Sequence, residues 1–386
     1  MVSQEVADDP LIKSVVRNSL RIWESDLEED ARARKIAHDY SRYVRRKFVF
    51  LIVCVILAIL VIGYALSIGD YHIGFFRTYE IIWGHMTGSI DRNDVTEALE
   101  DGIIFDLRMP RLAAGILAGI GLAVAGVTMQ STLMNPLADP YTTGVSSGAS
   151  FGATASIVLG FSLFGIAQYG LVANAFVFSL IPMGVIVLVS KIKNASPTTM
   201  IMAGIAVMYV FNAFTTVITL MADPNHLQDL YKWTVGSLGF VKAGDLPFMA
   251  SVIIPGSVVL TVLSGKLNIL AAGDESAKAL GVDADKLRRI CLVIVALVAA
   301  AVVSFTGLIG FVGLVAPHIV RTIIGPDNRL LMPASAAFGA LLLITADLIG
   351  RTVIAPAVLQ VGVITAFMGG PLFLWLILRR NSTIWG

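Results

Sequence analysis

Apolar runs of about 20 residues recur along most of this chain, and they constrain its fold more than any other feature. A run of that length, folded as an α-helix, crosses the hydrocarbon core of a bilayer. The composition agrees with this, since 56% of the residues are hydrophobic and only 14% are charged. An ordinary soluble domain is about 25% charged. The sequence therefore predicts an all-α, polytopic membrane protein, and it excludes a soluble enzyme, a disordered chain and a nucleic-acid binder.

About ten segments are apolar enough to span the membrane as helices. They are residues 48–68, 111–131, 143–160, 170–190, 199–221, 247–265, 290–304, 306–324, 330–350 and 361–378. The stretch 306–313 contains three glycines and is expected to be irregular backbone, which is tolerated at membrane depth only where protein buries it. Small residues four apart, such as Gly115 and Gly119 or Gly148 and Gly152, favour close helix packing in one bundle.

Composition divides the chain into a charged extension at residues 1–47, a membrane domain at 48–380 and a short tail at 381–386. Apolar residues recur at helical spacing between Leu11 and Leu27, which predicts an amphipathic helix in the extension. If the extension lies inside, the inner segments hold 21 of the 28 Lys and Arg residues. The positive-inside rule then places both termini in the cytoplasm, with the protein in the cell membrane.

The chain lacks the motifs of a transporter that powers itself. No phosphate-binding Gly-x-x-x-x-Gly-Lys-[Ser/Thr] loop occurs, and the five histidines are scattered, so neither ATP hydrolysis nor a metal site is predicted. Asp347 is the one carboxylate well inside a span, and its spacing from Arg351 predicts a local ion pair. Because a proton-driven carrier usually needs more buried carboxylates or histidines, the energy is expected to come from another polypeptide.

Three groups of residues carry functional hypotheses. The first is a set of outer arginines, Arg108, Arg111 and Arg351, which either pair with carboxylates of a partner or reach toward lipid headgroups. The second is the inner segment 266–289. Within it, residues 273–282 are expected to form a short helix, with Asp274 or a neighbour capping its start and Gly281 its C-terminus. The segment is either a docking element or an ordinary loop, and residues 283–289 are expected to form a second short helical piece that leads into the seventh span.

The third group is a polar stripe inside the fifth span. It consists of Asn212, Thr215, Thr216 and Thr219, which share one helical face. Such a stripe either lines a water-accessible path or forms hydrogen bonds between helices.

Several longer motifs resemble those of the FecCD-type permeases, the transmembrane subunits of ABC importers for iron–siderophore complexes, haem and cobalamin. The matching segments, in the family's order across about residues 48–380, are 108–112, 126–130, 135–140, 144–149, 273–282, 307–318 and 369–373. The resemblance implies a type II ABC importer permease fold that pairs as a homodimer, with the translocation path along the dimer axis. It also implies two ATPase subunits that use ATP and Mg, an extracytoplasmic binding protein, and no cofactor in this chain.

The resemblance also implies roles for individual residues. Arg108, Arg111 and Arg351 match positions that pair with glutamates of the binding protein. The segment that holds Asp274, Glu275, Lys278, Leu280 and Gly281 matches the coupling helix that sits in a groove of the ATPase. Spans 5 and 10 line the path in relatives, which favours the path interpretation of the stripe of Asn212, Thr215, Thr216 and Thr219.

Two departures from the family pattern stand out. Val358 and Gln360 replace the usual Glu and Pro before the last span, and the extension 1–47 is longer than usual.

The resulting hypothesis is a permease subunit for a bulky metal complex, first an iron–siderophore and next cobalamin or haem. The alternative is an ion-coupled secondary transporter that acts without an ATPase, which the shortage of intramembrane carboxylates disfavours.

Overall fold

The computed structural model describes residues 38, 45–69, 71–165, 169–193, 196–354 and 357–378. The amphipathic helix expected between Leu11 and Leu27 and the tail 381–386 lie outside these ranges. By its internal contacts the chain separates into two units, Met1–Phe50 and Leu51–Gly386, and the second unit contains the helical bundle described below.

Each of the predicted spans corresponds to an apolar helix among the described residues. Seven helices are long enough to cross a membrane: Arg45–Ser67, Val95–Thr132, α7 (Gly170–Lys193), α8 (Pro197–Thr219), α10 (Leu246–Val262), α13 (Ala284–Thr306) and α15 (Asn328–Thr352). The span that contains α10 is Ala243–Val262, because η5 (Ala243–Asp245) precedes α10 directly. Three more apolar helical segments are shorter: α6 (Val145–Leu159), α14 (Val312–Ile324) and Val361–Leu372 of α16 (Val361–Leu378). The expected all-α fold is confirmed, with seven to ten membrane-length apolar helices in the described part of the chain where about ten were expected.

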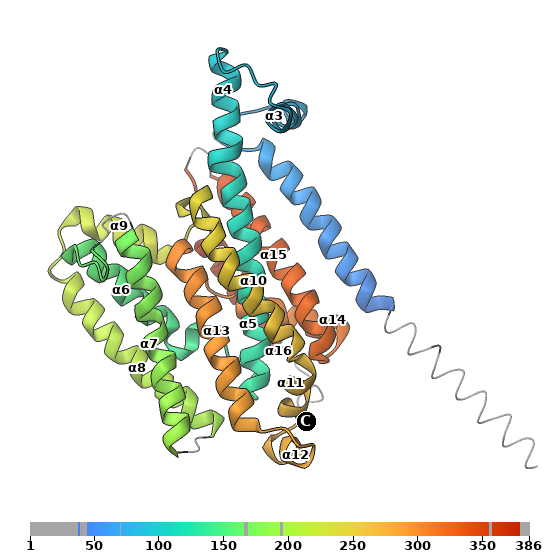
Figure 1. The fold of residues 1–386 in the computed structure, drawn as a ribbon, viewed down its shortest axis with the longest axis vertical. Helices are drawn as coiled ribbons and strands as arrows, with labels where there is room; N and C mark the ends of the chain where they lie inside the picture. Colours follow the sequence, from blue (N-terminus) through green and yellow to red (C-terminus); the bar gives the residue numbers. More distant parts are fainter. Residues whose placement is uncertain are drawn as a thin grey trace, which may run out of the picture. The chain divides into compact units, whose positions relative to one another are not determined.

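The long helix Val95–Thr132 is made of three consecutive parts: α4 (Val95–Gly102), the π-helix η1 (Ile103–Arg108) and α5 (Met109–Thr132). Its last part, α5, is the centre of the bundle, because α10, α13, α14 and α15 all pack against it. Figure 1 shows α5 enclosed by these neighbours, with α6, α7 and α8 forming a second group at one side.

Glycines allow the closest of these contacts. A Cβ on Gly119 of α5 would lie 2.4 Å from the carbonyl oxygen of Gly339 in α15, and no side chain fits in that space. A Cβ on Gly148 or Gly152 of α6 would lie 2.3 or 2.4 Å from a carbonyl oxygen of α7. The predicted close packing at these small residues is therefore confirmed for the α5–α15 and α6–α7 pairs.

The glycine-rich stretch between α13 and α14 is irregular, as expected. Gly307 and Phe311 both have left-handed backbone angles, with φ of 70° and 69°, and Ile309 between them is fully buried. The amide of Ser237 donates to the carbonyl of Thr306 at 2.7 Å, so neighbouring protein satisfies this carbonyl at the buried end of α13. Phe311 lies against Gly369 of α16, where a Cβ would come within 2.5 Å of it.

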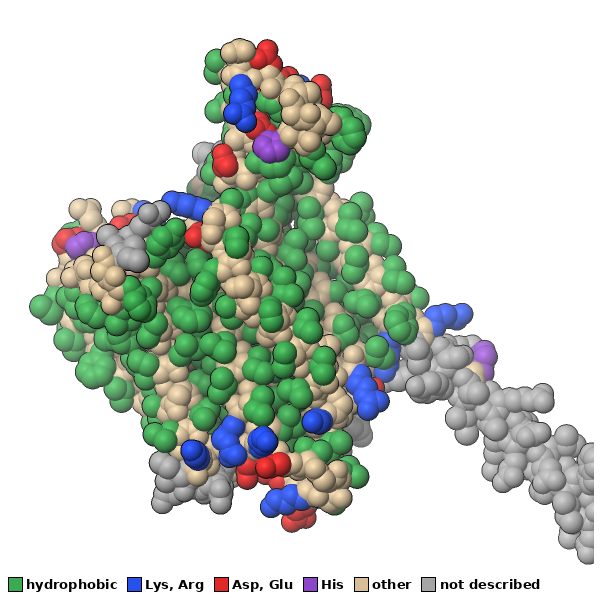
Figure 2. Space-filling view, in the orientation of Figure 1, with side chains coloured by type: hydrophobic (Ala, Val, Ile, Leu, Met, Phe, Trp, Pro, Cys, Tyr) green, Lys and Arg blue, Asp and Glu red, His purple; other side chains and the backbone are tan. Residues whose placement is uncertain are grey.

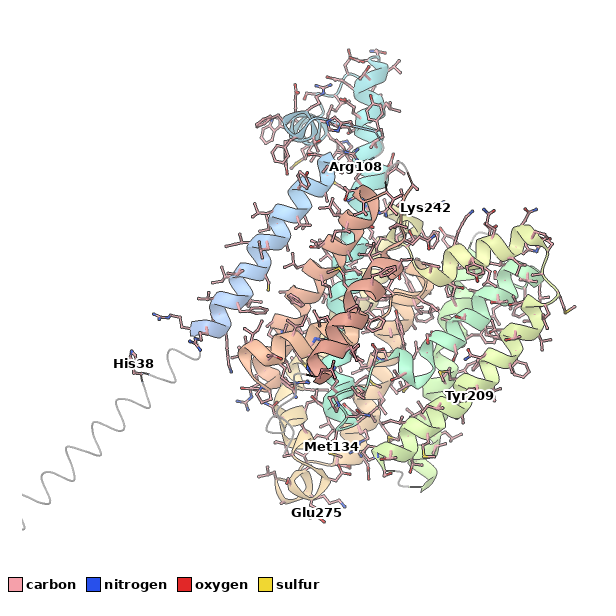
Figure 3. The ribbon with its side chains drawn as sticks, turned by 180° about the vertical axis from the view of Figure 1, so that it is seen from behind. His38, Arg108, Met134, Tyr209, Lys242 and Glu275 are labelled. Carbon is pink, nitrogen blue, oxygen red and sulfur yellow. The ribbon has the colours of Figure 1, made fainter. Side chains whose placement is uncertain are left out.

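Short helices cover the two ends of the bundle, and most of them were not expected from the sequence. One end, called the α4 end here, carries α3 (Phe75–Thr87), α4 and α9 (Pro224–Val235); the other, the α12 end, carries α11 (Ser264–Ala271) and α12 (Asp274–Ala279). Figure 3 shows Arg108 and Lys242 at the α4 end and Met134 and Glu275 at the α12 end. Single turns of 3-10 helix complete the connections: η2 (Tyr141–Thr143), η4 (Leu238–Phe240) and η5 (Ala243–Asp245).

Candidate functional site

The three outer arginines lie at the α4 end, and two of them share one carboxylate. The guanidinium nitrogens of Arg111 in α5 lie 2.8 to 3.1 Å from the carboxylate oxygens of Asp347 in α15. Arg351 pairs with the same carboxylate at 3.1 Å, which confirms the predicted Asp347–Arg351 pair. Arg111 is 236 residues away from Asp347 in the sequence, so its share in the pair became visible only in the fold.

Two of the arginines also hold the end of the first span. Arg351 donates to the carbonyl oxygens of Ile68 and Ala65 at 2.9 and 3.3 Å, and Arg108 donates to those of Leu66 and Tyr71. The carbonyls of Ala65 and Leu66 belong to the last turn of the Arg45–Ser67 helix, where a helix leaves carbonyls without partners, and those of Ile68 and Tyr71 follow it.

As a result, the arginines present little surface to a partner. Arg108 and Arg351 are 5% and 7% exposed, and the side chain of Arg111 is 16% exposed. In the structure they join the helices of this end, and binding-protein docking stays a prediction.

A further charged cluster at this end was not anticipated. Arg77 of α3 lies 2.8 Å from Glu100 and 3.1 Å from Glu97, both of α4, and 3.1 Å from Glu80. These hydrogen bonds, first the one to Glu100, raise the pKa of Arg77 above its usual value. The ion pairs to Glu97 and Glu100 join residues 20 and 23 apart and depend on α3 folding back against α4, so the sequence offered no signal for them.

At the α12 end, the predicted short helix is present as α12, and its N-cap position is Gly273, the neighbour of Asp274. Gly273, with φ of 105°, precedes the helix without a side-chain cap, and the Asp274 carboxylate instead accepts from Arg288 at 2.7 Å. Gly281 closes the helix with φ of 74°, as predicted. Residues 284–289 are helical and lead into the seventh span, as expected: they are the first turns of α13, capped by Asp283.

Arg288 connects α12 to the centre of the bundle. Its side chain is fully buried, and its guanidinium reaches Asp274 at 2.7 Å, Asp285 at 3.3 Å and the carbonyl oxygen of Thr132, the last residue of α5, at 3.1 Å. One side chain therefore joins the start of α12, the first turn of α13 and the end of α5.

The rest of α12 faces outward. Leu280, directly after the helix, is 67% exposed although it is apolar, and Glu275 and Lys278 are exposed as well. Ala277 is fully buried and holds α12 against the bundle. A short helix that is held on one side and presents charged and apolar groups on the other has the properties of a protein-binding element.

The polar stripe of α8 lies on an open surface. Asn212 and Thr216 are exposed and Thr215 and Thr219 are half-buried. The three threonine hydroxyls donate to carbonyls of α8 itself at 2.7 to 2.8 Å. These hydrogen bonds do not join α8 to another helix of the chain. The large apolar side chains beside the stripe are exposed as well, including Tyr209 at 68% and Phe214 at 54%; Tyr209 is labelled on α8 in Figure 3.

A cleft of about 530 Å³ opens between α9, the irregular stretch and α16. Its lining includes Thr234 and Val235 of α9, Leu308, and Val363, Ala366 and Phe367 of α16. The backbones approach closely at its base, where a Cβ on Gly362 would lie 1.8 Å from the carbonyl oxygen of Val235. The residues of the α8 stripe are not among those that line this cleft. Within one chain, the stripe and the cleft are therefore two separate surfaces.

Two further observations concern buried groups and metals. Asp139, between α5 and α6, is buried like Asp347 and Glu100, and its carboxylate accepts a hydrogen bond from the amide of Tyr141 at 2.6 Å. Within the described ranges, no group of three or more His, Cys, Asp or Glu side chains is placed to hold a metal ion.

Comparison with known proteins gives consistent matches over most of the chain. The profile of the FecCD transport family matches residues 54–379. A protein of Methanocaldococcus jannaschii assigned as an ABC transporter permease is 40% identical, over 90% of this chain and 99% of its own length. The hemin transport system permease of Yersinia pestis is 36% identical over 72% of this chain and 84% of its own length. The cobalamin import system permease of Halobacterium salinarum is 38% identical over 72% and 74%.

The fold has solved counterparts. A structure described as an inward-facing conformation of a transporter of the metal-chelate ABC type covers 86% of this chain and 99% of its own, with a TM-score of 0.73 and 28% identity. The PsaBC complex of Streptococcus pneumoniae, solved with a Fab, matches with a TM-score of 0.52 and 19% identity over 74% of this chain and 100% of its own, which supports the fold alone.

Proposed function

Because this chain belongs to the FecCD transport family and is therefore a multi-pass permease subunit of an ABC transporter, we propose that it imports a metal chelate as half of a homodimer. The named cargoes of its relatives are hemin, cobalamin, iron(III) citrate and iron(III) hydroxamate. An iron–siderophore complex is proposed first, and cobalamin or haem next. The chain itself is not an enzyme, and ATP is used by the partner ATPase.

The cleft beside α16 supports a bulky cargo with few specific contacts. Its described lining is apolar apart from the hydroxyl of Thr234. A surface of this kind offers no charged group to select one chelate over another, so selection falls to the binding protein.

The second copy is proposed to pack on the exposed faces of α8 and α16. Tyr209 and Phe214 of α8 and Phe367 of α16 are each more than half exposed. In such a dimer the stripe of Asn212, Thr215, Thr216 and Thr219 faces the path between the two copies. The hydroxyls bonded within α8 leave the exposed Asn212 amide to provide polarity to that path.

The ATPase is proposed to bind at the α12 end through Asp274, Glu275, Lys278, Leu280 and Gly281. Basic side chains gather around this end in Figure 2, which supports its placement in the cytoplasm together with both termini.

The binding protein is proposed to dock at the α4 end. There Arg111 is the most exposed of the three arginines and the one best able to meet a partner carboxylate. Arg108 and Arg351 hold the end of the first span beside it.

The observation that carries this proposal is α12, buried at Ala277 and exposed at Leu280 in a chain of this family. The experiment is purification of the tagged protein from its own membranes in mild detergent, with the co-purifying proteins identified by mass spectrometry. We expect an ABC ATPase to accompany the wild-type chain and to be lost with Leu280→Asp. The control Lys286→Ala changes an exposed residue at the same end and should keep the ATPase.

A wild-type chain that purifies alone and still transports in vesicles under an ion gradient would contradict the proposal. That result would revive the alternative of an ion-coupled secondary transporter, which membership of an ABC transporter family argues against.

A further inference from the structure

Helix α3 presents a large apolar surface that nothing within the described chain covers. Phe75, Phe76, Tyr79, Trp83 and Met86 are 48%, 86%, 39%, 68% and 74% exposed. At 100° per residue these five positions fall within an arc of about 100°, so they form one continuous stripe, called here the apolar stripe of α3. None of the five side chains is charged.

The opposite face of α3 is fixed to the protein. Ile81 is buried against Ile73 and Ile104, and Arg77 makes the ion pairs to α4 described above. His85 contacts the Asp101 carboxylate at 2.7 Å and stacks on the Phe105 ring with a centroid distance of 3.6 Å. Because these contacts set the rotation of α3 about its axis, the stripe is held outward as a permanent feature of the surface.

The depth of α3 follows from its contact with the first span. A Cβ on Gly63, one turn before the end of the Arg45–Ser67 helix, would lie 2.6 Å from the hydroxyl oxygen of Tyr79. The Phe75 ring lies 5.0 Å from the ring of Tyr79, centroid to centroid. Figure 1 shows α3 end on, beside the end of that span, so that it crosses the direction of the long helices. The stripe is therefore at the level where the span leaves the hydrocarbon core.

We propose that α3 is an interfacial anchor whose apolar stripe lies in the bilayer, between the acyl chains and the headgroups. Aromatic side chains concentrate at this depth, and amphipathic helices lie in its plane with their apolar face down. The stripe continues the exposed apolar surface of the first span, which includes Ile59, Leu60 and Tyr64 at 62%, 63% and 54%. Since the stripe carries no charge, the attraction is to lipid in general rather than to anionic headgroups.

The test uses spin labels in the full-length protein, reconstituted in phosphatidylcholine vesicles. The native Cys54 and Cys291 are buried, so a single added cysteine takes the label. The variant Phe76→Cys places it on the stripe, and the control Asn93→Cys places it on the exposed turn between α3 and α4. We expect dissolved oxygen to relax the label at position 76 several-fold more than a water-soluble nickel complex does, and the order to reverse at position 93.

A label at position 76 that behaves like the one at position 93 would overturn the proposal. It would also be overturned if position 76 became shielded from the nickel complex only when a binding protein was added, because the stripe would then be a protein-docking surface.

A second measurement leaves the stripe nearly intact: lipids brominated near the headgroup should quench the wild-type tryptophan emission more than that of Trp83→Phe. Equal quenching of the two proteins would contradict the placement. Neither readout depends on cargo or ATP, so failure here is distinct from failure of the importer proposal.

Discussion

At the scale of single residues, Asp347 is the buried carboxylate that two arginines of the α4 end share. Its carboxylate is 1% exposed and pairs with both Arg111 and Arg351. A buried charge is tolerated when its partners remain, and removing one partner leaves the others uncompensated. The three side chains therefore form one unit that joins α5, α15 and the end of the first span.

We predict that Asp347→Asn destabilises the protein by about 3–5 kcal/mol, because two buried guanidinium groups lose their shared counter-charge. The measurement is thermal unfolding of the purified chain in detergent. The matched control is Asp229→Asn, whose carboxylate forms an exposed pair with Lys232 at 3.5 Å and is expected to have an effect within about 0.5 kcal/mol. Equal melting temperatures for wild type and Asp347→Asn would show that the cluster does not hold this end together.

At the scale of elements, the contact between α12 and α5 is the one most relevant to coupling. Arg288 makes that contact without exposure to solvent, through Asp274 on α12 and the last carbonyl of α5. If a motor moves α12, this side chain passes the displacement to the central helix.

We therefore predict that Arg288→Met lowers transport several-fold per ATP hydrolysed while the ATPase still assembles with the chain. Methionine keeps much of the buried apolar volume and removes the donors to Asp274 and Thr132. The measurement is the ratio of uptake to ATP hydrolysis in vesicles, with Lys286→Met as an exposed control on the same turn. An unchanged ratio in the Arg288 variant would mean that coupling runs through other contacts.

Packing of α5 on α15 makes a second prediction at this scale. Gly119→Ala should destabilise the bundle, because its Cβ would meet backbone atoms of Gly339 and Ala340 at 2.4 to 2.6 Å and these cannot move aside alone. Gly184→Ala in α7 meets nothing within 4 Å and should be neutral or stabilising, by up to about 1 kcal/mol from helix propensity. Thermal unfolding of the two variants compares them, and equal melting temperatures would refute the tight contact.

The elements that the sequence predicted well are those whose cause is local. Apolar length alone located the spans, and Gly281 marked the end of α12. The contacts that the sequence did not predict join partners distant in sequence: Asp274 pairs with Arg288, and Arg111 pairs with Asp347 because α5 lies beside α15. Of the outer arginines, Arg108 and Arg351 are buried and Arg111 is partly exposed, which also depends on contacts between distant parts of the chain. Helices α3, α4 and α9 were missed because they lie between spans and a search for membrane-length runs passes over them.

At the scale of the whole molecule, one continuous helix connects the two ends. Val95–Thr132 begins in α4, where Glu97 and Glu100 pair with Arg77, and it passes the Arg111–Asp347 pair. It ends at the carbonyl of Thr132, which accepts from Arg288. Because α10, α13, α14 and α15 all pack on its α5 part, packed protein connects the α12 end to the α4 end through the core of the bundle. This arrangement suits a permease that opens alternately to its two sides while other subunits supply the energy.

The most direct test of this account is uptake by vesicles that contain the complex purified from its own membranes. The binding protein and a radiolabelled iron(III) hydroxamate are supplied on one side, and ATP is supplied on the ATPase side. The account predicts uptake that requires hydrolysable ATP, is absent with a non-hydrolysable analogue, and is insensitive to collapse of the ion gradients. Uptake that persists without the ATPase and follows an ion gradient would contradict it.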